Sequence, residues 1–565
     1  MDVNAISSLM RPVVQRHPRG ANARVLLTSV FGPYAQDDEY GSRAINPMEL
    51  FHNQVTREQG EFSPRRFHGS WGIRMIQANI SASCTVLDFP TRETFVRELK
   101  ANRYDVVGIS SIAVNVGKVR EMCRLVREVL PHAAIVVGGH VTSFPEIERD
   151  IDADHIVRGE GIAWMREYLG EAPDAPIKHP VLSSGFGLRI MGIGLPNLDY
   201  ATAVIIPSVG CPMGCNFCTT SAFFGGKGNV INFFSTGEEL FRVMEEAETV
   251  LQTKSFSIMD ENFLLNRRRA MELLDLMRQK KKSWSLHVFS SANAIQKYTY
   301  EELLELGIAS LWIGLESPRA EYVKLRDVDT LHLTKELQQH GIVLMGSTII
   351  GLEHHTPQNI REEIEHAVAH NTDYHQFMLY SPGPGTEFYR KLEQQGRVLD
   401  IDPADGHGQF AFHFEHEAIS REDSKKYLDL AFRLDFEKNG PSLFRMIRTN
   451  FQGWKRHRNH PNQRVRERFR RDILSLRYVY PPLLWAMERR LENEENPGAS
   501  QVRALRKEME GEFGSPTVMA TRMLGPLLQW ISHREKKRLE RGWTYEPPTS
   551  LVRNNWPHKK TAGLG

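Results

Sequence analysis

Short apolar runs rich in β-branched residues alternate with amphipathic stretches in the first part of the chain. The apolar runs cover residues 24–30, 84–88, 105–110, 134–139 and 155–160. Between them, residues 71–80, 95–101 and 116–130 place apolar side chains at helical period, whereas residues 31–70 form a long polar stretch. Strands that alternate with helices predict a parallel, doubly wound α/β sheet whose ligands bind at the carboxyl ends of its strands.

A second series of apolar runs follows a stretch rich in Pro and Gly. Its predicted strands cover residues 203–210, 255–260, 285–290, 311–315, 343–350 and 375–380, with amphipathic helices between them. Six strand–helix repeats at even spacing predict a partial (β/α)6 barrel. The catalytic groups of such barrels come from the C-terminal ends of the strands. Residues 421–439 then predict a helix, and the rest of the chain is basic and mainly helical in pattern.

These patterns divide the 565 residues into five parts. We expect a lead-in at 1–23, a doubly wound domain at 24–165, a linker at 166–200, a barrel at 201–400 and a helical region at 401–565. A hydrophobic content of 41% with 25% charged residues argues against wholesale disorder. The chain has no apolar run of 18 residues, no signal peptide and no secreted disulfide pattern, so we expect a cytoplasmic protein.

Charge is distributed unevenly along the chain. Residues 441–565 carry 25 Lys and Arg against 12 Asp and Glu, although the net charge of the whole chain is only +2. Arginine mixed with Trp, Phe and Leu suits a helix on an anionic bilayer, so we expect peripheral contact of this region with the inner face of the membrane. Nucleic acid ranks lower as a partner because no RNA-binding signature is present. A basic helical cap on the acidic remainder of the chain is the structural alternative.

Three of the five cysteines, Cys211, Cys215 and Cys218, directly follow the predicted strand at 203–210. Thiolates are soft ligands that suit iron–sulfur clusters, zinc or copper. A structural zinc site needs four protein ligands, but the next histidine is His287 and no further cysteine follows. Three thiolates without a fourth favour a four-iron cluster that leaves one iron open to a small molecule, and an incomplete zinc knuckle is the alternative.

At these residues the chain resembles the radical S-adenosylmethionine (SAM) enzymes, whose CxxxCxxC loop follows the first strand of a partial (β/α)6 barrel. The resemblance implies that Cys211, Cys215 and Cys218 ligate three irons of a [4Fe–4S] cluster while SAM chelates the fourth. It also implies reductive cleavage of SAM to a 5′-deoxyadenosyl radical, with electrons from a flavodoxin- or ferredoxin-type donor. Phe217 matches the family position that lies against the adenine.

Polar residues at the predicted strand ends match further positions of this family. Asp260 and Glu261 end the second strand, where the family contacts the methionine amino group, and an ammonium in a dry site needs such an acceptor. Asp260 as the cap of the next helix is the alternative. Ser291 ends the third strand and offers a hydroxyl. Glu316 resembles the position near the ribose or amino group of SAM, with a structural salt bridge as the alternative, and Ile349 lies in the strand whose backbone meets the adenine.

The N-terminal part resembles the cobalamin-binding domain of one large radical SAM subfamily. Ser110 ends the third strand, and Gly138 and Gly139 end the fourth, where family members place such residues against the nucleotide tail of the corrinoid. Glycines after a strand let the backbone approach a bulky ligand. The Asp-x-His-x-x-Gly signature that supplies a histidine to cobalt is absent after the first strand, as in many subfamily members. A domain that holds no cofactor is the alternative.

The resemblance implies hydrogen abstraction from an unactivated C–H bond, followed by C-methylation of a small-molecule or lipid substrate, including isoprenoids. A non-methylating cyclase or rearrangement enzyme and a non-catalytic Fe–S scaffold protein are the alternatives. No pattern identifies the catalytic residue that donates the final hydrogen. Residues 225–228 lack the pattern of a P-loop, and the adjacent His354 and His355 do not have metal-ligand spacing, so we predict neither a phosphate site nor a metal site there.

Overall fold

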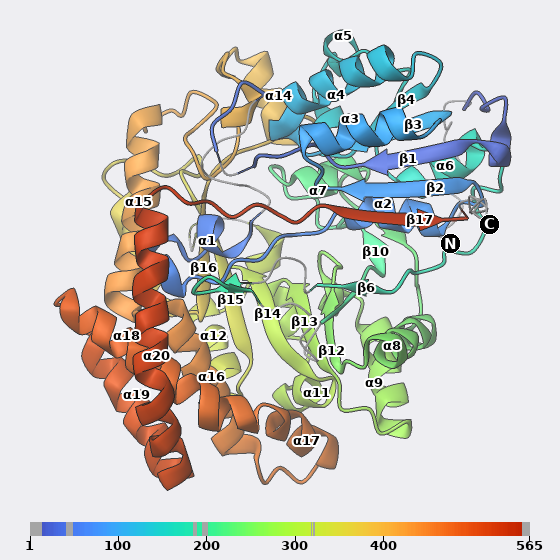
Figure 1. Cartoon of the computed structure of the whole chain (residues 1–565). Coiled ribbons are helices and arrows are strands. Elements are labelled where there is room, and N and C mark those ends of the chain that lie inside the picture. Colours follow the sequence, from blue (N-terminus) through green and yellow to red (C-terminus); the bar gives the residue numbers. More distant parts are fainter. Residues whose placement is uncertain are drawn as a thin grey trace, which may run out of the picture. The chain divides into compact units, whose positions relative to one another are not determined.

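The computed structural model describes residues 14–34, 36–40, 49–184, 189–194, 202–317, 319 and 322–555. The chain forms two compact units (Figure 1). The smaller unit contains Met1–Gly32, Ser70–Pro180 and Thr549–Gly565, and the larger unit contains Pro33–Gly69 and Val181–Pro548. The long polar stretch of the sequence therefore belongs with the barrel, although it precedes most of the doubly wound unit in the chain.

A six-stranded sheet of order β17-β2-β1-β3-β4-β5 forms the smaller unit. Its strands are β1 (Arg24–Thr28), β2 (Ser83–Asp88), β3 (Val106–Ser110), β4 (Ala134–Gly138), β5 (His155–Ile156) and β17 (Ser550–Asn554). The first five are parallel in the flavodoxin-like order 2-1-3-4-5, which confirms the predicted doubly wound sheet. The pattern did not predict β17, which pairs antiparallel with β2 (Figure 1).

Three helices of the smaller unit follow the predicted apolar period: α2 (Trp71–Ala78), α3 (Arg92–Ala101) and α4 (Val116–Val129). The sequence pattern did not predict α6 (Gly161–Tyr168), which overlaps the start of the expected linker at 166–200, or the single turn α5 (Ile147–Asp150) between β4 and β5. The α4 helix buries Val119, Met122 and Val126 completely, on the face that the sequence pattern marks as apolar. This regular framework fixes the carboxyl ends of β3 and β4, where Ser110 and Gly138 lie.

The larger unit is built on a seven-stranded sheet of order β16-β15-β14-β13-β12-β9-β6. Its parallel strands are β9 (Ala203–Ile205), β12 (Ser255–Ile258), β13 (Ser285–Ser290), β14 (Ile308–Gly314), β15 (Val343–Ile350) and β16 (Tyr374–Leu379). The short β6 (Leu182–Ser183) pairs antiparallel with β9 at one edge. Within the described residues, the strands at the two ends of this order, β16 and β6, do not pair with each other, so the barrel stays open, as the six predicted repeats indicate.

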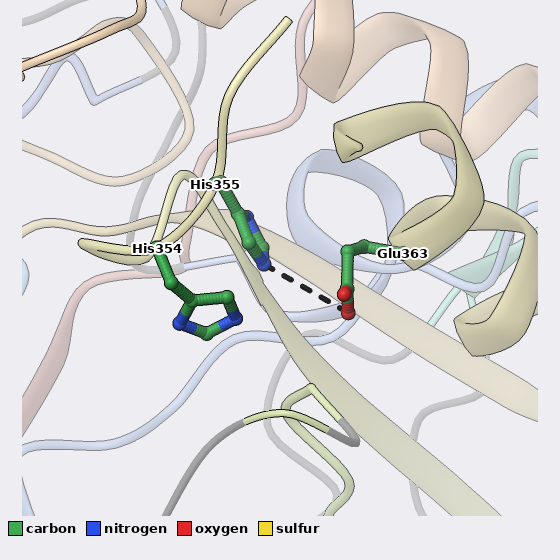
Figure 2. A group of neighbouring side chains, drawn as sticks. All are labelled: His354, His355 and Glu363. Carbon is green, nitrogen blue, oxygen red and sulfur yellow. Dashed lines mark ion pairs between the residues drawn. The ribbon is translucent and has the colours of Figure 1, made fainter. Parts of the chain in front are cut away.

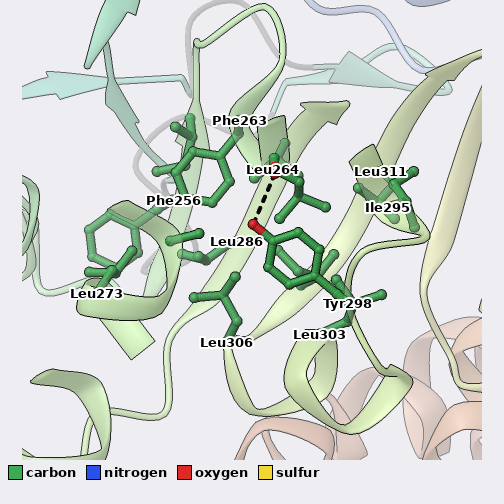
Figure 3. Close-up of a cluster of buried hydrophobic side chains, with 14 of the residues drawn as sticks. Phe256, Phe263, Leu264, Leu273, Leu286, Ile295, Tyr298, Leu303, Leu306 and Leu311 are labelled. Carbon is green, nitrogen blue, oxygen red and sulfur yellow. Dashed lines mark hydrogen bonds between the residues drawn. The ribbon is translucent and has the colours of Figure 1, made fainter. Parts of the chain in front are cut away.

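Helices cover the outer face of the barrel strands. The first are α8 (Gly237–Leu251), α9 (Arg267–Gln279), α10 (Ala292–Ile295), α11 (Tyr300–Glu305) and α12 (Thr330–Gln339), and α13 (Ile360–Ala369) and α14 (Glu387–Gln394) follow later. Phe256, Leu286 and Leu311 of the strands pack against this helical layer (Figure 3). The Tyr298 hydroxyl donates to the Leu264 carbonyl at 2.9 Å, so its polar atom is satisfied inside the core.

Residues 49–69 pack into the larger unit rather than forming an exposed polar loop. They contain α1 (Phe51–Gln54) and the 3-10 turns η3 (Arg57–Phe62). Thr56, Gln59 and Glu61 are all buried here. The Thr56 and Ser63 hydroxyls satisfy each other at 2.5 Å. Composition alone cannot reveal this burial, because Gln59 and Glu61 find their partners in the distant C-terminal helices.

The C-terminal region consists of long helices with an apolar core of their own. They are α15 (Arg421–Asn439), α16 (Ser442–His457), α17 (Gln463–Arg471), α18 (Tyr480–Asn493), α19 (Gly498–Phe513) and α20 (Ser515–Glu540). Phe451, Leu484 and Met509 are fully buried among them. Within the described part of the chain, no helix is both long and apolar enough to cross a bilayer.

The arginines of α17 point at the barrel. Arg468 donates to the Ile308 carbonyl at 3.0 Å, and Arg464 donates to the Lys282 carbonyl at 2.8 Å. The Arg471 guanidinium donates to the Ser283 carbonyl. These carbonyls lie at the N-terminal ends of β13 and β14. These arginines of α17 therefore cap the barrel, as the structural alternative to bilayer contact expects.

Candidate functional site

The three clustered cysteines lie in the loop between β10 (Ser208–Val209) and α7 (Thr219–Phe223), and all three are half-buried. Cys218 caps α7 because its sulfur accepts the Ser221 N–H at 3.5 Å, and the Ser221 hydroxyl donates to the Cys211 carbonyl at 2.8 Å. Burial first, and then the neighbouring Cys218 and Cys215 sulfurs, raise the pKa of Cys211 to about 11. A thiol with a raised pKa keeps its proton near neutral pH. It therefore releases that proton when it binds a metal.

A tight contact fixes the shape of the cysteine loop at Gly214. Its φ is 63°, and a Cβ there would lie 2.4 Å from the Cβ of Lys227. The Gly228 N–H also donates to the Pro212 carbonyl at 2.9 Å. Residues 225–228 thus pack against the cysteine loop through Lys227 and Gly228.

Aromatic rings surround Phe217, the residue expected to face adenine. Its ring meets Tyr322 edge-on at 5.4 Å and Tyr380 at 5.8 Å between centroids. The Lys324 ammonium lies 5.5 Å from the Phe217 centroid. Ile349, on β15, is half-buried and packs against the same cluster. Phe217 and Ile349 therefore border the same apolar cluster.

Glu316 and Lys324 form a largely buried ion pair at the site. The Lys324 ammonium lies 2.5 Å from Glu316 Oε1, and both side chains are largely buried. Among the described residues, Glu316 Oε2 is buried without a hydrogen-bond partner, and Glu316 adopts a left-handed φ of 44°, which is costly for a residue with a Cβ. Burial disfavours the charge of Lys324, but Glu316 and the Cys215 sulfur outweigh this effect and raise the pKa of the ammonium.

Asp260 differs from Glu316 because both of its carboxylate oxygens are occupied. Oδ2 accepts the Ser208 hydroxyl at 2.8 Å and pairs with Arg269, and Oδ1 accepts the Asn262 N–H at 2.9 Å. Ser208 immediately precedes the cysteine loop, whereas Arg269 lies on α9. Asp260 thus ties the cysteine loop to the end of β12, which is a positioning role.

Glu261 lies beside the cysteines with its side chain at the mouth of the barrel. The side chain is exposed to solvent, and desolvation by the surrounding protein, followed by the nearby Asp260, raises the pKa of Glu261 to about 7. The charge of Glu261 also acts on the thiols of Cys211 and Cys218. Among the sequence-predicted acceptors for an ammonium, Glu261 and Glu316 are the two with free carboxylate capacity next to the cysteine loop.

Ser291 belongs to a hydrogen-bond network at the end of β13. Its hydroxyl donates to Asn293 Oδ1 at 2.7 Å, and Asn262 Nδ2 donates to the Ser291 oxygen at 2.9 Å. Asn262 Oδ1 in turn accepts the Ser290 hydroxyl at 3.0 Å. These bonds hold the ends of β12 and β13 together, so Ser291 supports the site without a free donor.

At the carboxyl edge of the smaller unit, Ser110 and Gly138 are register partners on β3 and β4. Gly139 has a φ of 82°, and a Cβ there would lie 2.5 Å from the Ser111 carbonyl, so packing inside the unit requires this glycine. A Cβ on Gly138 would meet only the Val157 carbonyl at 3.9 Å. Internal packing therefore does not explain Gly138, and the bare backbone beside Ser110 fits close approach by a bulky ligand.

His354, His355 and Glu363 gather behind the end of β15 (Figure 2). His355 Nδ1 accepts the N–H groups of residues 351–352 at 2.9 and 3.2 Å, so its Nε2 carries the proton and faces Glu363 Oε2 at 4.0 Å. The same Glu363 oxygen accepts the Ser317 hydroxyl at 2.7 Å. A protonated Nε2 cannot ligate a metal, so we assign no metal to this group.

Sequence reasoning missed the residues that hold the expected site residues in place. Lys324, Tyr322, Ser208 and Arg269 belong to no spaced motif. Ser208 and Tyr322 contact residues distant in the chain, whereas Lys324 and Arg269 pair with carboxylates eight and nine residues away. One signal was available for Arg269: it lies on the helix that follows Asp260, within reach of a strand-end carboxylate. Lys324 gave no signal.

Residues 66–169 match the family described as B12 binding domain, and residues 205–437 match the Radical SAM superfamily. An uncharacterized methyltransferase of Pyrococcus horikoshii is 25% identical over 395 residues, covering 61% of this chain and 83% of that protein. The bacteriochlorophyllide d C-12(1)-methyltransferase of Chlorobaculum tepidum is 25% identical over 343 residues, covering 57% and 72%.

A solved structure with a similar fold is that of TsrM from Kitasatospora setae, a radical SAM methyltransferase with cobalamin and a [4Fe–4S] cluster bound. The TM-score is 0.50 with 15% sequence identity, over 80% of this chain and 99% of that chain. At this identity the likeness concerns the fold. It agrees with the doubly wound and barrel units described above.

Proposed function

Because the chain belongs to the radical SAM family that carries a cobalamin-binding domain, we propose that it is a cobalamin-dependent methyltransferase acting on an unactivated carbon of a small molecule. The observation that carries this proposal is the junction of the cysteine loop with the Glu316–Lys324 pair. Three thiols and a buried carboxylate oxygen without a partner meet at one strand-end site. The methyltransferase names of the two relatives support the same reaction class.

The residues present fit the cofactors that this function requires. Cys211, Cys215 and Cys218 would hold three irons of a [4Fe–4S] cluster, and Glu316 and Glu261 offer carboxylates to the ammonium of SAM. Phe217 offers its ring to the adenine. When bound, the cluster supplies the electron that cleaves SAM, and the corrinoid carries the methyl group.

The protein's own contribution is to bind, orient and exclude water. Asp260 holds the cysteine loop through Ser208, and the aromatic group around Phe217 keeps one side of the site apolar. In such an environment a charge-assisted hydrogen bond to Glu316 is worth more than in water. Ser110 and Gly138 would receive the corrinoid at the edge of the smaller unit.

Anaerobic reconstitution with iron, sulfide and cobalamin tests the proposal. We expect a corrinoid spectrum and, under reduction in the presence of SAM, both S-adenosylhomocysteine and 5′-deoxyadenosine. Cys215→Ala is the control and should form neither product. Formation of 5′-deoxyadenosine alone would indicate a non-methylating radical reaction. Absence of both products with a loaded cluster would indicate a non-catalytic scaffold.

The electron donor is proposed to be a small flavodoxin- or ferredoxin-type protein. The cysteines are half-buried, so a protein donor can approach the loop closely enough for electron transfer. Replacing dithionite with reduced flavodoxin should sustain SAM cleavage. A rate no higher than that without any reductant would contradict this partner.

Peripheral membrane contact is proposed only for α20, since the arginines of α17 are engaged by the barrel. One face of α20 exposes Met519, Met523, Leu524, Leu527 and Trp530. These positions recur at helical period and are flanked by exposed basic residues, a combination that suits an anionic bilayer. Flotation with phosphatidylserine vesicles should recover the chain, and the double variant M523E/L527E should stay unbound. Equal flotation of the variant would contradict the contact.

A further inference from the structure

The inner face of the open barrel is lined by side chains that are only half-buried. Along β13, β14 and β15, residues that pack on the helices are buried and alternate with half-exposed residues on the opposite face. Closed barrels fill their interior with packed side chains, whereas here the inner positions stay accessible. The half-exposed apolar side chains of these strands and β16 include Phe289, Trp312, Met345, Ile349 and Met378.

Two aromatic rings form a flat part of this inner face. Phe289 and Trp312 stack with centroids 4.9 Å apart and an interplanar angle of 26°. The Trp312 Nε1–H donates to Ser347 Oγ at 2.7 Å, so the polar atom of the indole is already satisfied. His287 is also fully bonded, between the Ser255 and Ser310 hydroxyls at 2.9 and 2.8 Å. The wall therefore offers apolar and aromatic contact rather than free hydrogen bonds.

A short hairpin from residues 49–69 brings a cation to this wall. Glu49 pairs with Phe67, and the Leu50 N–H donates to the Arg66 carbonyl at 3.3 Å. Directly opposed residues of an antiparallel pair project to the same side, so Arg66 shares a side with Leu50. Leu50 belongs to the apolar cluster against which Trp312 and Met345 pack.

The position of Arg66 agrees with its electrostatic effect on the barrel. Burial first, and then the nearby Arg66 guanidinium, lower the pKa of His287 to about 4. His287 lies on the inner face of β13, between the two serines named above. Two observations therefore place Arg66 close to the inner wall: its position opposite Leu50 in the hairpin and its electrostatic effect on His287.

Arg66 differs from the other enclosed arginines of the larger unit because its side chain has no partner. The adjacent Arg65 pairs with Glu49 at 3.5 Å, and Arg269 and Arg445 each pair with a buried aspartate. The Arg66 guanidinium forms neither an ion pair nor a hydrogen bond with any residue that the structure describes. Enclosing a cation without a counter-charge is costly, so such a residue marks a place where an anion binds.

We propose that the substrate has an apolar, ring-containing body that lies on Phe289 and Trp312 and an anionic group, carboxylate or phosphoryl, that Arg66 binds. The inference rests on the proposed function, because it assumes that the reacting molecule occupies the barrel interior. Arg66 acts here as a substrate-binding and specificity residue. Its fork of donors matches the oxygens of a carboxylate or a phosphoryl group.

Three naphthalene probes test the proposal on the full chain by fluorescence anisotropy. They are 1-naphthoate, 1-naphthyl phosphate and the neutral 1-methoxynaphthalene. We expect the wild type to bind at least one anionic probe more tightly than the neutral one. Arg66→Gln should weaken anionic binding by about 10- to 100-fold, the worth of a charge-assisted contact, and leave the neutral probe unchanged. The ratio of naphthoate to naphthyl phosphate affinity identifies the preferred anion.

Control variants separate charge from fold. Arg66→Lys should restore most of the anionic binding, Trp312→Ala should weaken all three probes, and Arg522→Gln, on the exposed face of α20, should change none. Anionic affinity that survives Arg66→Gln, or probe binding indifferent to Trp312→Ala, would overturn the proposal. The assay needs no cluster and no SAM, so its failure is distinct from a failure to form S-adenosylhomocysteine.

Discussion

Replacing Lys324 with Met should separate the structural role of the Glu316–Lys324 pair from its role in the site. The Glu316 side chain is 4% exposed, its Oε2 has no hydrogen-bond partner in the part of the chain that the structure describes, and Lys324 is its counter-charge at 2.5 Å. Removing one partner of a buried ion pair costs about 3–5 kcal/mol because the remaining charge is uncompensated. We expect Lys324→Met to lose stability of that size in urea unfolding of the cluster-free chain.

The double variant E316Q/K324M should recover most of this loss. Both charges are then absent, and replacing a whole buried pair by neutral groups is often neutral for stability, so we expect a value within about 1 kcal/mol of wild type. SAM binding should behave differently, because the cofactor loses its charged partners in the double variant as well. Anaerobic equilibrium dialysis of the reconstituted protein should show affinity reduced by about tenfold or more.

An exposed ion pair of the same unit provides the matched control. Lys391 and Glu353 lie 3.1 Å apart with side chains 56% and 48% exposed. Lys391→Met should cost less than about 1 kcal/mol and leave SAM binding unchanged. If E316Q/K324M bound SAM as tightly as wild type, the pair would be a structural salt bridge and nothing more. If Lys324→Met cost no more than Lys391→Met, the burial argument itself would fail.

Three further predictions concern the cysteine loop and pH. Cys215→Ala should keep the thermal melting temperature of the iron-free chain but retain no four-iron cluster after anaerobic reconstitution; zinc in the wild type instead of iron would contradict this. Gly214→Ala should cost about 1–3 kcal/mol, because a left-handed residue meets Lys227, and unfolding and cluster yield should fall together. The pKa of His287 lies at about 4 in the folded chain against 6.5 in the unfolded chain, so stability should be lost as pH falls below 6.5, by about 2 kcal/mol at pH 5. Urea unfolding at pH 7 and pH 5 should show a smaller loss for His287→Gln than for wild type or for His132→Gln on the surface.

The repeating framework could be predicted because each repeat follows from local physics. An apolar strand followed by an amphipathic helix has few ways to bury both surfaces, so the α/β order and the open barrel follow from the pattern. The helix at Arg421–Asn439 was predicted with the bounds it has. A serine cap and an abrupt change to Gly440 mark its two ends.

Segments whose partners are distant in the chain could not be predicted. The strand β17 pairs with β2, more than 460 residues earlier in the sequence, and the exposed half of its pattern gives no sign of a neighbour. Residues 49–69 looked polar, yet Glu61 is buried because its guanidinium and hydroxyl partners, Arg490 and Ser532, come from distant helices. Such burial depends on tertiary context, which no local window of sequence contains.

At the site, sequence patterns located the acidic strand ends but could not rank them. Asp260 and Glu316 both follow a barrel strand and both contact a basic side chain. The two carboxylates differ in their hydrogen bonding. Three donors bond to the oxygens of Asp260, whereas Glu316 has one buried oxygen without a donor among the described residues. The backbone of Glu316 is also strained. A satisfied buried carboxylate needs no ligand, but an unsatisfied one costs free energy until a ligand supplies the missing donor. This difference, visible only in the fold, is why we assign Asp260 to the framework and Glu316 to the cofactor.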